Sequence, residues 1–195
     1  MTRIISGRLR GRRLAVPPSD TRPTSDRVRE AVFNAIVSRV DLDAVAVLDL
    51  FAGSGALGIE AVSRGAGQAL FIEQGSGAVA VLKKNLAQIG AAVPSVRATV
   101  RRASLPTALA GRCPVEGGFH LVLADPPYSV GAEVDLPVLE ALVDGRWLAR
   151  DALVVWERSR REPAVRWTGD FEVVFERTYG ETVVEMARQV DTVTP

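Results

Sequence analysis

The 195-residue sequence contains a single cysteine, Cys113, and a single histidine, His120. One cysteine excludes a disulfide framework, and one residue of each kind leaves no cluster of cysteine and histidine ligands for a metal ion. The same scarcity leaves no histidine to act as general base beside a serine or cysteine nucleophile. We therefore expect a protein without a metal site.

Long apolar stretches are also missing from the sequence. No segment approaches the roughly eighteen continuous apolar residues of a membrane span, and the N-terminal MTRIISGRLRGRR lacks the apolar run of a signal peptide. We expect a cytoplasmic protein with no membrane partner. Hydrophobic residues still make up 47% of the chain, which is enough to bury the core of a single domain.

Lysine is nearly absent, so arginine supplies 22 of the 24 basic residues. Nine arginines against three acidic residues fall within residues 1–40, and the rest of the chain carries more acidic than basic groups. The codon usage of a GC-rich genome would explain the excess of arginine but not its clustering. A basic arm on a mildly acidic body favours a polyanionic partner, since guanidinium groups suit phosphate oxygens.

The apolar pattern alternates between segments typical of strands and of helices. Residues 3–16 predict a hairpin of two short strands, and a helix capped by Thr24 or Ser25 then runs to about Val40. This alternation is typical of a parallel sheet covered by helices. Further strands are expected at 45–50, 69–73, 96–100, 119–124 and 152–157, with helices at 56–64, 76–89, 104–110 and 135–143.

The end of the chain follows a different pattern. Apolar segments at 171–177 and 182–188 are separated only by TYGE, which predicts an antiparallel hairpin rather than a crossover. Parallel units closed by a hairpin favour the α/β, Rossmann-like, seven-stranded sheet of class I S-adenosylmethionine-dependent methyltransferases over a six-stranded dinucleotide fold. We expect a basic β-hairpin arm at 1–20, a methyltransferase domain at 21–190 and a loose tail at 191–195.

A glycine-rich loop follows the first of the parallel strands. LDLFAGSGALG places G-x-G-x-x-G at Gly53, Gly55 and Gly58, a spacing that several cofactor sites share. Asp49, just before the loop, would repel the pyrophosphate of NAD but attract the positive charges of S-adenosylmethionine. The loop therefore disfavours an NAD-dependent oxidoreductase, although Asp49 could instead be a helix cap. Glu73, at the tip of the next strand, could accept hydrogen bonds from two ribose hydroxyls.

A second motif, ADPPYS, follows strand 119–124 at the carboxyl edge of the sheet, where α/β proteins bind ligands. Transfer of a methyl group to an exocyclic amine needs acceptors that align the amine, because its lone pair is conjugated with the ring. The Asp125 carboxylate and the Pro126 carbonyl would accept from the amine, and Tyr128 would stack on the base. The alternative is a proline turn capped by aspartate. Together with the glycine loop, the motif predicts an amino-methyltransferase.

Four motifs in order, RIISGRLRGRRL, RPTSDRVREAVF, LDLFAGSGALGIEAVSRGA and DPPY, resemble the bacterial family of 16S rRNA (guanine(966)-N(2))-methyltransferases. The resemblance spans residues 3–188 and implies N2-methylation of one guanine of 16S rRNA within the small ribosomal subunit. It implies S-adenosylmethionine as cofactor and a catalytic role for Asp125, Pro126 and Tyr128. The cofactor residues that it implies are Asp49, Phe51, Ala52, Gly53, Ser54, Gly55 and Glu73. We expect Gln74 and Ala103 to contact the cofactor as well.

The basic arm gains a role from this resemblance. Its arginines would bind RNA phosphates with little reading of sequence, and we expect little of residues 3–16 to be deeply buried. The alternative is that the arm merely covers the sheet edge. A second, weaker basic patch is expected at Arg158, Arg160 and Arg161. The residues assigned to RNA are Arg3, Arg8, Arg10, Arg12, Arg13, Arg22, Thr24 and Arg27.

Two positions depart from the pattern of the family. Arg102 stands where relatives often have an acidic or amide residue, so we expect the backbone around Ala103 to hold the adenine amine. His120 stands where an aspartate is usual, and we interpret it as a structural substitution. Two other functions remain open. One is a DNA adenine-N6 methyltransferase, which usually carries an extra target-recognition region, and the other is a non-catalytic RNA-binding protein on the same scaffold.

Overall fold

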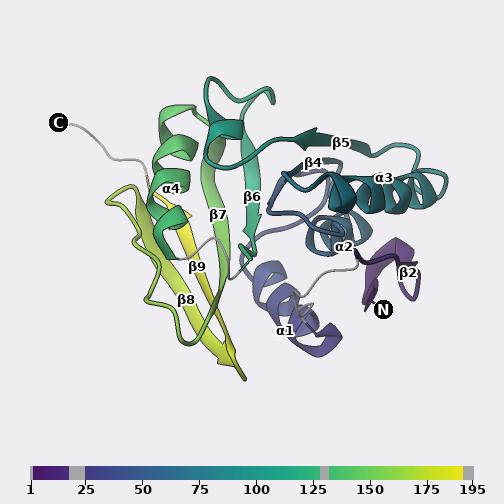
Figure 1. Cartoon of the computed structure of the whole chain (residues 1–195), viewed down its shortest axis with the longest axis horizontal. Coiled ribbons are helices and arrows are strands. Elements are labelled where there is room, and N and C mark those ends of the chain that lie inside the picture. Colours follow the sequence, from purple (N-terminus) through teal and green to yellow (C-terminus); the bar gives the residue numbers. More distant parts are fainter. Residues whose placement is uncertain (1, 18–24, 128–131, 191–195) are drawn as a thin grey trace.

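A computed structural model describes residues 2–17, 25–127 and 132–190, and its centre is one seven-stranded sheet (Figure 1). The strand order is β5-β4-β3-β6-β7-β9-β8. The first five of these strands run parallel, and β8 and β9 form an antiparallel hairpin, which confirms the expected class I methyltransferase fold. The strands are β3 (Ala46–Leu50), β4 (Gln68–Glu73), β5 (Arg97–Arg102), β6 (Phe119–Ala124), β7 (Leu148–Ser159), β8 (Phe171–Tyr179) and β9 (Thr182–Gln189).

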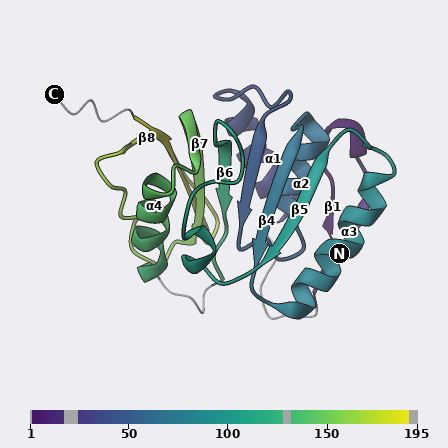
Figure 2. The ribbon, with the colours of Figure 1, turned by 90° about the horizontal axis from the view of Figure 1, so that it is seen from above.

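Helices cover both faces of this sheet and divide the core into two (Figure 2). Helices α1 (Asp26–Val37), α2 (Ala56–Arg64) and α3 (Ser76–Gly90) pack on one face, and α4 (Asp135–Asp144) packs on the other. Successive strand side chains alternate between the two cores, so that Val47 faces the first group of helices and Leu48 faces α4. None of the helices in the described ranges is long and apolar enough to cross a membrane.

Most observed boundaries follow the predicted ones closely, but β7 begins at Leu148 rather than at residue 152, and one predicted helix is absent. Helix α1 begins after Ser25, whose Oγ accepts the Val28 N–H at 3.3 Å, so Ser25 is the N-cap. The helix expected at 104–110 is only the 3-10 turn η2 (Thr107–Leu109). Pro106 has no N–H to donate, and Gly111 has a φ of +88°, so the segment between them is too short for an α-helix. A second 3-10 turn, η4 (Ala132–Val134), leads into α4.

The N-terminal arm forms the predicted hairpin. Strands β1 (Thr2–Arg3) and β2 (Arg13–Leu14) pair antiparallel, with the 3-10 turn η1 (Gly7–Leu9) between them. The expectation that little of the arm is deeply buried is wrong. Ile4, Leu9 and Leu14 are at most 3% exposed and join the core of α1, α2 and α3. The arm alternates arginines with apolar residues, so its charged groups reach solvent while its apolar side chains complete the core.

Buried polar groups also tie the arm to α2. The Glu60 carboxylate, which is fully buried, accepts the backbone N–H groups of Ile5 at 2.7 Å and Ser6 at 3.0 Å. Asn85 of α3 bonds to both backbone groups of Ala15 and also donates to the Ser54 carbonyl at 2.8 Å. Asn85 therefore connects the arm to the glycine-rich loop, and the arm is an integral part of the fold.

Candidate functional site

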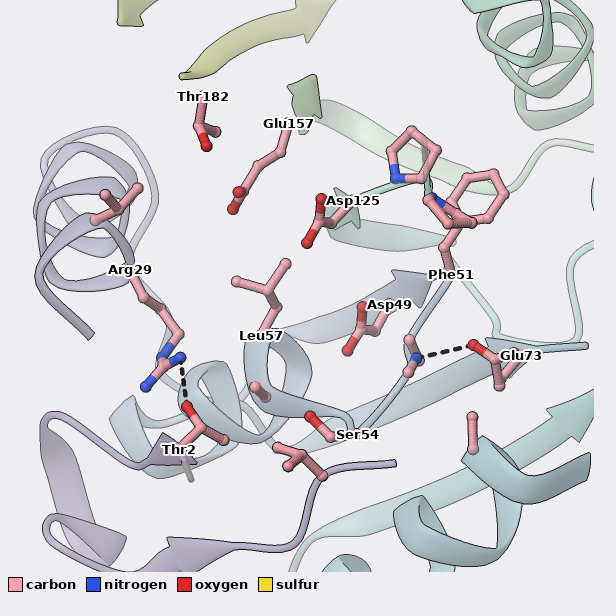
Figure 3. Close-up of a pocket in the computed structure, with 18 of the residues that line it drawn as sticks. Thr2, Arg29, Asp49, Phe51, Ser54, Leu57, Glu73, Asp125, Glu157 and Thr182 are labelled. Carbon is pink, nitrogen blue, oxygen red and sulfur yellow. Dashed lines mark hydrogen bonds between the residues drawn. The ribbon is translucent and has the colours of Figure 1, made fainter. Parts of the chain in front are cut away.

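The carboxyl ends of the parallel strands open into one cavity of about 1430 Å³. Pockets that hold one small ligand are typically about 300–1,000 Å³, so this cavity has room for a cofactor and a substrate group together. Its walls include the ends of β3, β4, β6 and β7, one side of α1, and the tip of the β8–β9 hairpin (Figure 3). The residues predicted to be catalytic, to hold the cofactor or to bind RNA that line it are Arg27, Asp49, Phe51, Ala52, Gly53, Ser54, Glu73, Gln74, Ala103, Asp125 and Pro126.

The glycines of the loop after β3 have different roles. Gly53 has a φ of +54° and lines the cavity. Gly55 has a φ of +81° and does not line it; a Cβ there would lie 2.4 Å from Leu82 Cδ1. At Gly58 a Cβ would lie 2.8 Å from Asp49 Oδ2, so glycine is required for the aspartate to sit against α2. Gly55 thus supports the shape of the loop, and its predicted place at the cofactor stays a prediction.

Asp49 is a buried carboxyl group at the floor of the cavity, 1% exposed. Its Oδ2 accepts the Gly58 N–H at 2.9 Å in the first turn of α2, so the alternative interpretation as a helix cap describes a real contact. Burial raises the pKa of Asp49 well above its ordinary value, and the nearby charges of Asp125 and Glu73 raise it further, against the lowering effect of the Gly58 N–H. A cation in the cavity would relieve this unfavourable burial and favour the ionised form.

Glu73 joins two loops at the cavity wall. Its Oε2 accepts the Gly53 N–H at 2.9 Å, drawn in Figure 3, and its Oε1 accepts the Gly75 N–H at 2.6 Å. These bonds hold the carboxylate still, and each oxygen keeps a second lone pair that can accept from a ligand hydroxyl. The arrangement therefore fits a ribose diol.

The end of β5 contributes backbone groups rather than side chains to the cavity wall. The Ala103 N–H donates to the Glu73 carbonyl at 3.1 Å, and Ala103 lines the cavity. Arg102 is exposed and its Nε donates to the Gln74 carbonyl at 3.3 Å. The guanidinium group thus binds the adjacent loop, and the role of the backbone around Ala103 in holding an adenine stays a prediction.

Asp125 and Pro126 stand at the end of β6, and both line the cavity with Pro127. Tyr128, the last residue of the motif, lies outside the described residues, as do Arg22 and Thr24. In Figure 3 the carboxyl groups of Asp125 and Asp49 reach into the same space. The structure thus brings the motif after β6 and the loop after β3 to one cavity, as the sequence predicts.

Several cavity residues were not found from the sequence. Glu157, at the end of the apolar run LVVWE in β7, is 1% exposed and reaches into the cavity beside Asp125 (Figure 3). A carboxylate that ends a buried strand was the signal that indicated Glu73, and it would have indicated Glu157 as well. Arg29, Leu57 and Thr182 come from α1, α2 and the terminal hairpin, whose approach to the strand ends has no local sequence signal.

Most of the arginines assigned to RNA belong to the N-terminal hairpin. All five arginines of the hairpin are exposed. Arg3 pairs with Asp26 at 2.9 Å, and Arg8 and Arg12 donate to the carbonyls of Val62 and Gln88, each at 3.2 Å. These contacts orient the side chains against the body and leave their surface accessible to an anion.

The expected second basic patch is smaller than predicted. Arg158 is largely buried in an ion pair with Glu185 and lines the cavity instead, whereas Arg160 and Arg161 are exposed. His120 is exposed and its Nδ1 accepts the Ala46 N–H at 3.4 Å, which agrees with its interpretation as a structural substitution.

Known proteins resemble the whole chain. The family model described as "Conserved hypothetical protein 95" matches residues 2–188. The Bacillus subtilis protein named "Putative rRNA methyltransferase YlbH" is 37% identical over 96% of this chain and 98% of its own length. The Escherichia coli K12 "Ribosomal RNA small subunit methyltransferase D" is 43% identical over 80% of this chain and 73% of its own length.

Solved structures agree with these sequence matches. An Escherichia coli structure described as "Putative methyltransferase yhhF" has a TM-score of 0.79 and 34% identity, and the alignment covers 96% of this chain and 97% of that one. The motifs that meet at the cavity and this full-length similarity lead to one conclusion. The chain belongs to the "Conserved hypothetical protein 95" family, that of the ribosomal RNA small subunit methyltransferase D proteins.

Proposed function

We propose that this protein transfers a methyl group from S-adenosylmethionine to the exocyclic N2 of one guanine in small-subunit ribosomal RNA. The observation that carries the proposal is the meeting of the Asp125-Pro126 turn and the glycine-rich loop in one cavity large enough for two ligands. Membership of the family supports an rRNA substrate, since the relatives are named for that activity.

The residues of the cavity fit S-adenosylmethionine better than a dinucleotide. Asp49 lies where a pyrophosphate would meet a buried carboxyl group, and burial raises the pKa of Asp49, with the nearby charges of Asp125 and Glu73 adding to the rise. A ligand ammonium beside Asp49 would favour its ionised form, and Glu73 would accept from the ribose hydroxyls with the lone pairs that its two backbone bonds leave. When bound, the cofactor supplies an electrophilic methyl group.

Asp125 and the Pro126 carbonyl would orient the target amine. Hydrogen bonds from both N2 hydrogens to these acceptors hold the nitrogen in line with the methyl group and raise its electron density. Asp125 can also accept the proton that N2 loses once the new bond forms. Tyr128 completes the motif as the residue proposed to stack on the base.

The exposed arginines of the arm, together with Arg27 at the cavity rim, would hold the RNA backbone. An rRNA substrate within the small subunit would place the reaction in the cytoplasm. The proposed partner surface would include the arm and α1, both of which contribute residues to the cavity wall.

Methyl transfer to small-subunit particles that lack the modification tests the proposal. We expect wild-type protein to produce N2-methylguanosine, detected by nucleoside mass spectrometry, and Asp125→Ala to abolish it while cofactor affinity stays within a few-fold. Asp144→Ala is the matched control, because Asp144 is exposed at the end of α4 and does not line the cavity. Wild-type turnover by Asp125→Ala would refute the assignment, and N6-methyladenosine as product would favour the adenine methyltransferase instead.

A further inference from the structure

The tip of the β8–β9 hairpin contributes an arginine and an aromatic ring to the wall of the cavity. Arg177 and Tyr179 both line it, as does Thr182 across the turn. Arg177 and Tyr179 are two positions apart in a regularly paired part of β8, so their side chains lie on the same face of the strand. Tyr179 packs against the core formed with α1, α2 and α3, so this is the face of the sheet that α1 covers.

Arg177 is an exposed cation with a defined orientation. Its guanidinium lies over the Tyr179 ring, with the central carbon 5.5 Å from the ring centroid. A cation–π contact of this kind orients an arginine without neutralising its charge. Within the described ranges Arg177 forms no ion pair, and Glu181, which also lines the cavity, pairs with Arg161 at 3.5 Å. The hairpin tip therefore presents a positive charge at the cavity.

The arginines of the cavity wall are of two kinds. Arg29 and Arg158 are largely buried, and each pairs with a carboxylate of the protein. Arg27 and Arg177 are exposed, and neither forms an ion pair with any residue that the structure describes. The charges of these two are thus available to an anionic ligand, one from α1 and the other from the terminal hairpin.

The position of Arg177 favours the substrate over the cofactor as this ligand. Asp49 and Glu73, the proposed cofactor residues, lie at the ends of β3 and β4, whereas β8 is the far edge of the sheet, beyond β6, β7 and β9. Figure 3 shows Thr182 of the hairpin and Glu73 on opposite sides of the cavity. Figure 1 shows α1 between the hairpin and the N-terminal arm. Arg177 therefore stands across the cavity from the cofactor residues and across α1 from the arm.

An RNA strand whose target base enters the cavity has phosphates on both sides of that base. We propose, on the basis of the function proposed above, that Arg177 binds an RNA phosphate next to the target guanine, across α1 from the arm. A guanidinium suits this role because it donates two parallel hydrogen bonds to phosphate oxygens. The arm with Arg27 and the hairpin with Arg177 would then hold the backbone on either side of the base. The contact positions the strand and reads no sequence.

Binding to small-subunit particles that lack the modification, measured by filter binding across a salt series, tests the proposal. Arg177→Gln should reduce the slope of log affinity against log salt by roughly 0.7–0.9 and weaken binding about four- to fivefold at about 0.15 M salt, as expected for one lost phosphate contact. Arg112→Gln is the matched control and should keep the wild-type slope, because Arg112 is exposed in the loop before β6, whereas the cavity lies beyond the other end of that strand. Both variants should keep the wild-type melting temperature and the wild-type affinity for S-adenosylmethionine in calorimetry.

Two results overturn the inference. One is a natively folded Arg177→Gln variant that binds particles with the wild-type slope. The other is a variant that loses cofactor affinity while its slope is unchanged, which would assign Arg177 to the carboxylate of the cofactor. An unchanged slope for Arg177→Gln alone leaves the proposed function intact. If wild-type protein binds the particles without any salt dependence, the RNA contacts of the proposed function fail first, and the inference fails with them.

Discussion

The substitution Leu9→Ala tests whether the N-terminal arm is part of the core. Leu9 is 1% exposed in the core formed with α1, α2 and α3, and its backbone N–H donates to the Ser63 hydroxyl at 2.9 Å. Truncating a buried leucine costs about 2–5 kcal/mol. For a chain of this length each kcal/mol lowers the melting temperature by roughly 2–4 °C, so we expect a loss of about 4–20 °C.

Thermal unfolding followed by circular dichroism measures this loss, and Arg10→Ala is the matched control. Arg10 is the next residue in the same turn and is exposed, so its removal should change the melting temperature by no more than about 2 °C. Deletion of residues 1–16 would remove Ile4, Leu9 and Leu14 and leave Glu60 buried without its two backbone donors. The free energy lost in this way is comparable to the whole free energy of unfolding of a domain, about 5–15 kcal/mol, so the truncated chain should not fold cooperatively. Equal melting temperatures for Leu9→Ala and Arg10→Ala would show that the arm is only loosely attached.

Two further predictions concern charge. Asp49→Asn should raise the free energy of unfolding of the ligand-free protein at neutral pH by about 1–2 kcal/mol, since the amide removes a buried carboxylate, and should weaken S-adenosylmethionine binding by about 10- to 100-fold in calorimetry. Because the folded-state pKa of Asp49 is raised, the wild-type protein should lose stability as pH rises from 3.8 through that raised value, while cofactor affinity increases over the same range; a flat affinity profile would contradict the ammonium contact. Replacement of Arg8, Arg10, Arg12 and Arg13 by glutamine should flatten the slope of log RNA affinity against log salt by two units or more, at roughly 0.7–0.9 per lost phosphate contact. An unchanged slope would move the RNA surface to Arg160 and Arg161.

The fold was largely predictable because its signals are local. The runs VAVLDL and FHLVLA are continuous apolar strands, and the four residues TYGE permit only a tight antiparallel return. The predicted helix at 104–110 failed because Pro106 and Gly111 restrict the backbone on both sides, which apolar spacing alone does not reveal. The prediction that the arm is little buried failed for another reason. Five arginines dominate its composition, while its three apolar side chains join a core built from α1, α2 and α3, and the Leu9 backbone N–H bonds to Ser63 of α2, far away in the sequence.

The residues of the candidate site also fall into those with a local sequence signal and those placed only by the tertiary structure. Asp49, Glu73 and Asp125 end strands and stand in recognisable motifs, so the order of the chain was enough to bring them to one edge of the sheet. Glu157 lies two residues before the end of β7, and only the pairing of β7 with β6 places it beside Asp125. Asn85 lies in the middle of α3, and its link between Ala15 and Ser54 exists only once the arm has folded back over the loop.

Mass spectrometry of 16S rRNA from cells that lack this protein tests the central claim most directly. The account predicts that one N2-methylguanosine disappears from the RNA, that the wild-type coding sequence restores it, and that Asp125→Ala does not. An RNA that keeps all its N2-methylguanosine, or that loses N6-methyladenosine instead, would contradict the account.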